Sequence, residues 1–125
     1  MTERARPKVL VVEDDPDELE LFGSLLEAHG FEVTLAATAA EGIAKLRENV
    51  FDFLLVDYNL PDGTGTAMIR DARKQGVLDG TPACLATAYP FPDRDPDMLL
   101  LRKPVDVATL VRTAHEAARR HRREG

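Results

Sequence analysis

The chain has 125 residues, 44% of them hydrophobic, and carries a formal net charge of −6. This length suits one compact domain and excludes a second, so we expect a single domain over 1–125 with its core at about 8–120. The start, Met1–Pro7, has no apolar stretch of the secretory kind, and no apolar run is long enough to span a membrane. These features predict a cytoplasmic protein that does not enter the membrane.

The charge is unevenly distributed along the chain. Four arginines and one glutamate lie in 119–125, so the rest of the chain carries a net charge of −9. An acidic body repels phosphate backbones, which argues against nucleic-acid binding by the body. The arginines at the end are expected to solvate a helix and complement its dipole. The lone Cys84 cannot form an internal disulfide and is predicted to be a small core residue.

Apolar runs alternate with helical patterns along the chain. Four continuous apolar runs predict strands buried on both faces, and one segment of alternating polarity predicts an edge strand. In chain order these strands are 9–12, 31–36 (the edge strand), 53–56, 83–86 and 98–101. Strands buried on both faces favour a parallel sheet.

Helix-start signals stand between the predicted strands. Asp15 precedes a proline, Thr38 and Glu41 form a capping-box pattern, a third helix is expected over Gly65–Gln75, and Asp106 can cap the last one. Apolar residues then recur at helical spacing, including Val50 in the second helix and Val107 in the last. Strands alternating with helices predict an α/β fold with an open parallel sheet covered on both faces.

Chemically distinctive residues follow four of the five strands. They are Glu13 and Asp14 after the first strand, Asp57 after the third, Thr87 after the fourth, and Lys103 and Pro104 after the fifth. In open parallel sheets, ligands bind beyond the carboxyl ends of the strands, so the three carboxylates are expected to converge. Their repulsion demands a proton or a cation, and Mg²⁺ prefers such oxygen ligands. Asp14 alone would also be typical of a helix cap.

At these positions the chain resembles the receiver domain of two-component response regulators, from Lys8 to about Arg120. Asp57 matches the phosphorylated aspartate of that family, and Pro61 and Gly65 follow it by the usual four and eight residues. The resemblance implies a flavodoxin-like, doubly wound sheet of five parallel strands in the order 2-1-3-4-5.

The resemblance also implies a chemistry for the strand ends. Asp57 would accept a phosphoryl group from a partner's phosphohistidine, while Lys103 and the Thr87 hydroxyl bind phosphoryl oxygens. The implied Mg²⁺ ligands are Asp14, Asp57 and the backbone carbonyl of Asn59, with Glu13 acting through water. Ala88, Tyr89 and Pro104 are expected to modulate the site. Such a protein catalyses its own phosphorylation and dephosphorylation but is primarily a signalling switch.

The chain departs from the usual receiver pattern after Thr87. Only 15 residues, 88–102, separate Thr87 from Lys103, which leaves Ala88–Asp97 for the whole crossover and excludes an ordinary fourth helix. Three prolines and three aspartates in that segment favour an extended or single-turn connection with little apolar burial. Leucines stand where most receivers have an aromatic residue before the lysine, and Leu85–Tyr89 resembles the Phe-Ala-Thr-Gly-Tyr motif of a divergent group. Tyr89 is either a replacement for that aromatic or a simple cover for the loop.

Expected partners and rival functions follow from the same residues. The resemblance implies a histidine kinase or histidine phosphotransfer protein as donor and a downstream protein as target, because no DNA-binding domain is expected. A homodimer is left open. A flavin-binding domain is disfavoured by the acids after the first strand, and an aspartyl phosphatase by Asn59. The remaining alternatives are a phosphorylation-independent interaction module and the receiver portion of a hybrid histidine kinase.

Overall fold

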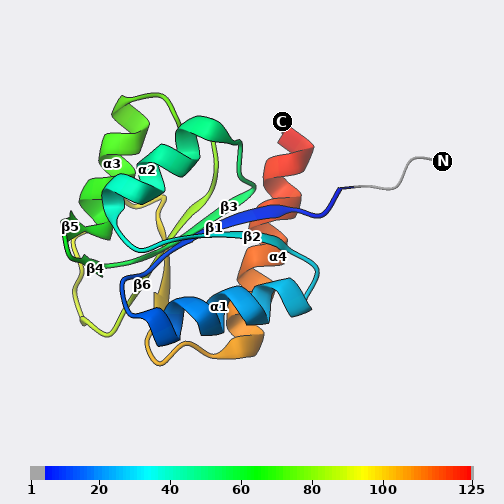
Figure 1. Ribbon diagram of the computed structural model, residues 1–125, viewed down its shortest axis with the longest axis horizontal. Helices are drawn as coiled ribbons and strands as arrows, with labels where there is room; N and C mark the ends of the chain where they lie inside the picture. Colours follow the sequence, from blue (N-terminus) through cyan, green and yellow to red (C-terminus); the bar gives the residue numbers. More distant parts are fainter. Residues whose placement is uncertain (1–4, 125) are drawn as a thin grey trace.

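The protein is built on a parallel sheet of five strands, seen in a computed structural model that describes residues 5–124, the side chain of Glu124 excepted (Figure 1). The strands are β1 (Lys8–Val12), β2 (Glu32–Ala36), β3 (Phe53–Asp57), β6 (Ala83–Thr87) and β7 (Leu99–Arg102). Their order is β2-β1-β3-β6-β7, which confirms the predicted flavodoxin-like topology. Most of the polar start, residues 1–4, lies outside the described part of the chain.

Helices cover both faces of this sheet. They are α1 (Pro16–Ala28), α2 (Ala39–Glu48), α3 (Gly65–Lys74) and α4 (Val107–Glu124). Alternate residues of the central strands point to opposite faces, so Leu10 and Leu54 pack with α2 and α3, whereas Val11 and Leu55 pack with α1 and α4. Cys84 is fully buried on the second face, as predicted, and burial raises the pKa of its thiol to about 12.

The predicted helix caps are present. The Asp15 carboxylate accepts a hydrogen bond from the Asp17 amide at 3.0 Å. The Thr38 hydroxyl accepts one from Glu41 at 3.1 Å, and Asp106 accepts one from Thr109 at 2.9 Å. Each cap satisfies an amide that the first turn of a helix leaves without an internal partner.

A two-stranded hairpin lies directly after β3. It consists of β4 (Asn59–Leu60) and β5 (Gly63–Thr64), which pair antiparallel. The carboxylate of Asp62, at the turn of this hairpin, accepts hydrogen bonds from the amides of Ala39 and Ala40 at 2.9 and 3.0 Å. The hairpin therefore joins the end of β3 to the start of α2.

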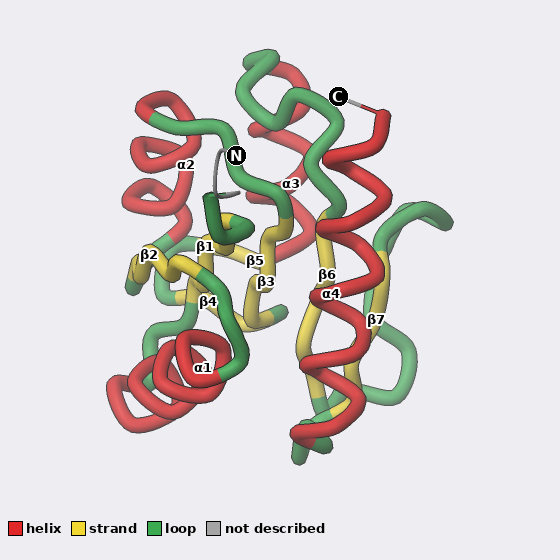
Figure 2. Tube along the Cα trace, turned by 90° about the vertical axis from the view of Figure 1, so that its right-hand side faces the viewer, coloured by secondary structure: helices red, strands yellow, loops and turns green. Residues whose placement is uncertain are grey.

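The last strand corrects a prediction. The strand lies at the edge of the sheet, as the predicted order implies, but the run 98–101 was expected to be buried on both faces, and Leu99, the first residue of β7, has an exposed fraction of 39%. The physical reason is the crossover between β6 and β7: it contains no helix, as predicted, so nothing equivalent to α3 covers that side (Figure 2). The prediction that 31–36 forms an edge strand is confirmed by β2.

Two smaller corrections concern helix faces. Val50 and Val107 were placed on apolar stripes, but their exposed fractions are 56% and 43%. Val50 lies beyond the end of α2, which is capped at Asn49, and Val107 is the first residue of α4. The apolar spacing therefore runs past the end of α2 at Val50, and at Val107 it starts before the buried stripe of α4 begins.

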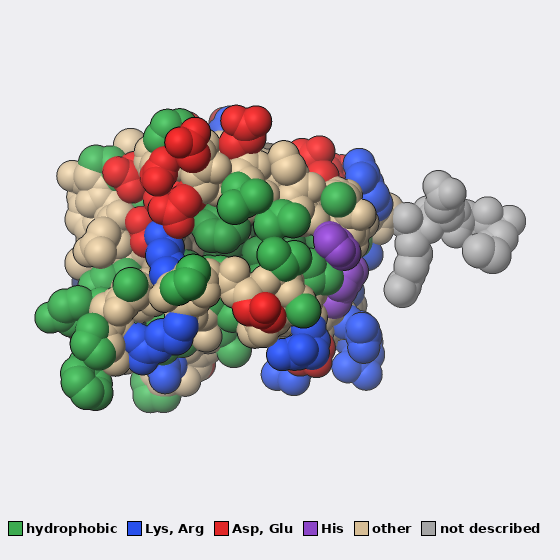
Figure 3. Space-filling view, turned by 90° about the horizontal axis from the view of Figure 1, so that it is seen from below, with side chains coloured by type: hydrophobic (Ala, Val, Ile, Leu, Met, Phe, Trp, Pro, Cys, Tyr) green, Lys and Arg blue, Asp and Glu red, His purple; other side chains and the backbone are tan. Residues whose placement is uncertain are grey.

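The surface nearest α1 carries both signs of charge in separate areas. Figure 3 shows acidic side chains gathered along one side of this face and Lys and Arg side chains along the other. At the basic end of α4, His121 and Arg122 lie 3.1 and 3.5 Å from the Asp52 carboxylate. That end of the helix therefore binds an acid of the protein itself as well as solvent. No helix among the described residues is both long and apolar enough to cross a membrane.

Candidate functional site

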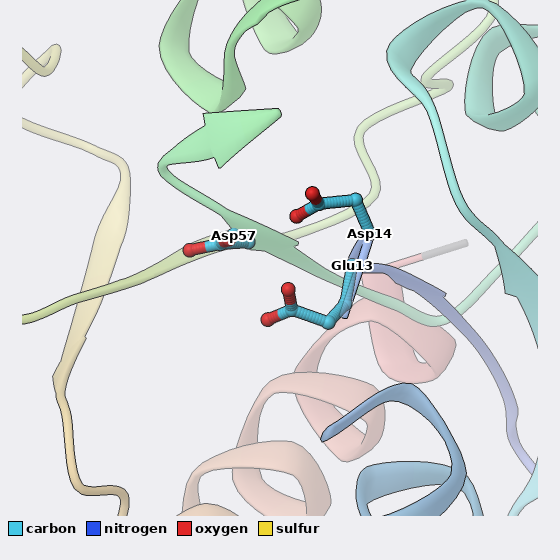
Figure 4. A group of neighbouring side chains, drawn as sticks. All are labelled: Glu13, Asp14 and Asp57. Carbon is cyan, nitrogen blue, oxygen red and sulfur yellow. The ribbon is translucent and has the colours of Figure 1, made fainter. Parts of the chain in front are cut away.

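Three carboxylates meet at the carboxyl end of the sheet, as predicted. Strands β1 and β3 are parallel neighbours with Val12 opposite Val56, so the residues that end them are brought together. One carboxylate oxygen from each of Glu13, Asp14 and Asp57 lies within 4.8 Å of the others (Figure 4). Glu13 and Asp57 are buried, whereas Asp14 is exposed. The cluster thus has a dry side and a side open to solvent.

Lys103 reaches this cluster from the segment after β7. Its ammonium Nζ lies 3.0 Å from Glu13 Oε1 and 3.2 Å from Asp57 Oδ1. A third carboxylate, that of Glu18 on α1, lies 3.1 Å from the same Nζ and was not predicted. The peptide bond between Lys103 and the exposed Pro104 is cis. The lysine is therefore surrounded by acids from three elements.

The electrostatics of the cluster show an excess of negative charge. Burial is the main cause that raises the pKa of Glu13 to about 7, against the opposing effect of its hydrogen bonds with Lys103 and the Asp15 amide. Burial by itself would lower the pKa of Lys103, but its bonds to Glu13 and Glu18 raise that pKa above its ordinary value. One ammonium group faces more carboxylates than it can neutralise, so the site favours an added cation.

Carboxylate oxygens at this spacing are suitable ligands for Mg²⁺. The ion binds hard oxygen donors and keeps several waters, and the solvent-exposed side at Asp14 leaves room for them. Asn59, whose backbone carbonyl was expected to contribute, follows Asp57 by two residues and is exposed in β4. The donor set therefore fits the expected cation.

Thr87 ends the neighbouring strand β6 and is 2% exposed. Its hydroxyl accepts a hydrogen bond from the Tyr89 amide at 2.9 Å, and its carbonyl accepts one from the Lys103 amide at 3.0 Å. A threonine hydroxyl that accepts a bond still has its own hydrogen to donate. Thr87 therefore links the lysine loop to the start of the crossover.

The two remaining predicted residues, Ala88 and Tyr89, lie at the mouth of the site and are exposed. The Tyr89 ring stacks on the ring of Tyr58, with centroids 6.1 Å apart and planes inclined by 12°. Tyr58 directly follows Asp57, and sequence reasoning did not single it out. The available signal was its position, an aromatic residue at the carboxyl end of a central strand.

Comparison with known proteins agrees with this geometry. Residues 9–94 match the model of the response regulator receiver domain family. Protein PilH of Pseudomonas aeruginosa is 29% identical over 85% of this chain and 93% of that protein. A 14.6 kDa protein of Leptolyngbya boryana is 32% identical over 90% of each chain.

Among solved structures, the chain is similar to a CheY-like response regulator receiver domain protein from Methanospirillum hungatei. The TM-score is 0.84 with 30% sequence identity, over 96% of this chain and 99% of the other. The family match extends over most of the chain, and the sheet order and the acids at the strand ends agree with it. The chain therefore belongs to the response regulator receiver domain family of two-component signalling.

Proposed function

We propose that Asp57 accepts a phosphoryl group from the phosphohistidine of a histidine kinase or a histidine phosphotransfer protein. The observation that carries this proposal is the position of Asp57. It ends a central strand, its carboxylate lies 3.2 Å from the Lys103 ammonium, and two further carboxylates lie within 4.8 Å. An acid that faces both a fixed cation and a cation site is suited to receive a highly charged group.

The chemistry is a phosphoryl transfer between two side chains. A carboxylate oxygen of Asp57 attacks phosphorus, an O–P bond forms and the P–N bond breaks, and the imidazole nitrogen of the donor keeps the electron pair of that bond. Bound Mg²⁺, held by Asp14, Asp57, the Asn59 carbonyl and Glu13 through water, would neutralise charge on the phosphoryl oxygens. Lys103 would bind another of those oxygens, and the Thr87 hydroxyl would donate to a third.

Output would pass through protein contacts of this single receiver unit, 1–125, in the cytoplasm. Phosphorylation adds charge and hydrogen-bond acceptors, which only one arrangement of the Thr87 and Lys103 loops satisfies. The second candidate function is a phosphorylation-independent interaction module. The complete set of Asp57, Lys103 and Thr87 at one edge favours the phosphoacceptor. The same chemistry would serve a receiver within a hybrid kinase.

The test of the phosphoacceptor is an intact-mass measurement after incubation with acetyl phosphate and Mg²⁺. The wild type is expected to gain one phosphoryl mass, and Asp57→Asn is expected to gain none. Asp71→Asn is the matched control, because Asp71 is an exposed acid of α3 outside the cluster. Labelling of the Asp57→Asn variant would show that another residue accepts the phosphoryl group. An unlabelled wild type would favour the interaction module.

The test of the cation site is thermal unfolding with and without Mg²⁺. A ligand that binds only the native state raises the unfolding temperature, so wild type should gain stability from the ion. Asp14→Ala should lose most of that gain, and Glu13→Gln should lose less because its contact is through water. An unchanged gain in Asp14→Ala would contradict the assigned ligand.

A further inference from the structure

The crossover between β6 and β7, residues 88–98, is held by polar contacts rather than by a packed helix. Met98 at its end is buried in the core, but its other large side chains give little burial, since the exposed fractions of Tyr89 and Phe91 are 57% and 87%. Arg102 donates hydrogen bonds to the carbonyls of Tyr89 and Pro90. The prediction of low apolar burial within Ala88–Asp97 is confirmed, but the sequence did not reveal which contacts replace that burial.

One set of contacts is an ion-pair ladder between α3 and the crossover. Arg70 lies 3.0 Å from the Asp93 carboxylate and 2.8 Å from that of Asp95, and Arg73 lies 3.5 Å from Asp95 and 2.8 Å from Asp97. The two arginines are three residues apart on one helix face, and the three acids follow one another at every second residue of the crossover, so the two rows lie against each other. Hydrogen bonds from Arg70 lower the pKa of Asp95.

The second set of contacts centres on Tyr58. Its amide donates to the Ala86 carbonyl at 3.0 Å, and its carbonyl accepts from the Gly65 amide at 2.8 Å, so its backbone is fixed between β6 and α3. Its hydroxyl accepts a hydrogen bond from the Asp93 amide at 3.2 Å. The hydroxyl of Thr66, in the first turn of α3, donates to the Asp93 carbonyl. Both backbone polar groups of Asp93 are thus bound, the amide by Tyr58, directly after Asp57, and the carbonyl by Thr66 of α3.

We infer that Tyr58 is a positioning residue that couples Asp57 to the crossover, an inference that rests on the proposed phosphorylation of Asp57. Tyr89, at the start of the crossover, donates its amide to the Thr87 hydroxyl and stacks its ring on Tyr58. When the Thr87 hydroxyl turns toward a phosphoryl oxygen, its hydrogen bond with the Tyr89 amide changes geometry. Tyr89 then moves against the ring of Tyr58, whose backbone is fixed. The same ring holds Asp93 in the middle of the crossover.

The residues before Lys103 exclude a coupling through that position. Leu101 is buried against the α1 and α4 side of the core, and Arg102 is occupied with the carbonyls of the crossover. No aromatic ring stands there to change its orientation. The stacked pair of Tyr58 and Tyr89 provides the aromatic contact on the other side of Thr87, between the phosphoacceptor and the crossover.

The experiment is hydrogen exchange of the whole chain with and without beryllofluoride and Mg²⁺, with the fluorine resonance of bound beryllofluoride recorded in parallel. Tyr58→Phe removes only the hydroxyl and should make the Asp93 amide exchange about two- to tenfold faster in the free protein, as expected for one lost hydrogen bond. Tyr58→Leu removes the stack as well. It should bind beryllofluoride but lose the change in exchange over 88–98 that the wild type shows.

The controls separate coupling from stability. Phe91→Ala alters a similarly placed aromatic residue that is almost fully exposed, and it should keep the wild-type response. Tyr89→Leu should lose the response as Tyr58→Leu does, and the double variant should lose no more, because both substitutions remove one contact. If Tyr58→Leu does not fold, Tyr58→Phe still tests the contact through the exchange of the Asp93 amide.

Three results would overturn the inference. A wild-type response over 88–98 in a beryllofluoride-bound Tyr58→Leu protein would remove Tyr58 from the coupling and leave the proposed function intact. An Asp93 amide that exchanges equally fast in wild type and Tyr58→Phe would also remove Tyr58 from the coupling and leave the proposed function intact. A wild type with no bound beryllofluoride resonance would overturn the phosphoacceptor assignment itself, and the coupling with it.

Discussion

The two crossovers on either side of β6 connect neighbouring parallel strands by different physical means. Between β3 and β6 the chain forms α3, which buries Met68, Ile69 and Ala72 against the sheet. Between β6 and β7 it forms no helix and is held by arginines on the outer side of α3. A crossover can thus be short when an adjacent helix supplies polar contacts, but one side of β7 is then left exposed.

The difference predicts different responses to the environment. Charge screening by salt weakens exposed ion pairs but does not weaken apolar burial. Segments with few buried apolar contacts also open more readily than the packed core. The α3 crossover is therefore expected to behave as part of the core, and residues 88–98 as a segment that can change its arrangement without unfolding the sheet.

The two crossovers should differ most in how much stability is lost when an apolar side chain in each is truncated. Ile69→Ala should lower the free energy of unfolding by about 2–5 kcal/mol, because it leaves a cavity beneath α3 where the side chain is fully buried. Phe91→Ala removes a larger side chain from the other crossover but should change that free energy by less than about 0.5 kcal/mol. Urea unfolding of both variants measures the contrast, and equal losses would show that Phe91 packs in solution.

A second prediction concerns how closely α3 approaches the site. A Cβ added at Gly65 would lie 2.6 Å from the Asp57 carbonyl oxygen and 2.9 Å from Leu85 and Val56 side-chain atoms. Gly65→Ala should therefore cost about 1–3 kcal/mol in unfolding free energy and slow the labelling of Asp57. Gly23→Ala is the control, since its nearest neighbour is the end of the Leu35 side chain at 3.1 Å, which can yield. Matching losses in the two variants would contradict the special role of the close approach.

A third prediction separates the carboxylate cluster from the ion-pair ladder by the sign of their pH dependence. The pKa of Glu13 is raised from 4.5 to about 7, so without Mg²⁺ this residue makes the fold progressively less stable as pH rises through that interval. Asp95 has a lowered pKa, so its contribution is lost only as pH falls below the ordinary value of 3.8.

Thermal unfolding measured at a series of pH values tests whether stability falls or rises with pH as expected for Glu13. The difference in stability between wild type and Glu13→Gln should grow in favour of the variant as pH rises from about 4.5 to about 7. Glu20→Gln is the control, because Glu20 is an exposed acid of α1. A difference that is constant with pH would show that Glu13 titrates normally.

The smallest expected effect concerns the ladder alone. Added salt should speed hydrogen exchange within 88–98 and leave exchange within α3 unchanged, because the Debye length shortens to about 3 Å at 1 M. Arg70→Gln with Arg73→Gln should give fast exchange at every salt concentration. Lys74→Gln, on the same helix, should behave as the wild type. Equal salt responses in both crossovers would show that the ladder does not hold the segment.

Some features of the crossover and of the site could be predicted from the sequence because they depend on local patterns. Apolar runs and caps placed Asp57, Thr87 and Lys103 at strand ends, and parallel strands bring such ends together. Three prolines in 88–97 excluded a helix there. The same patterns could not show that Leu99 of β7 is exposed, because an apolar run does not reveal which elements cover it.

The order of the elements, the strand-end carboxylates and the absence of a crossover helix could therefore be read from the amino-acid sequence. The contact partners of the polar side chains depend on the folded arrangement: Glu18 binds Lys103, Tyr58 binds Asp93, and Arg70 binds Asp95, which is 25 residues away in the chain. The physical reason is that periodicity records local conformation and the side that is buried. Exposed polar side chains can pair with many others, and the packing of the helices on the sheet selects which of them meet.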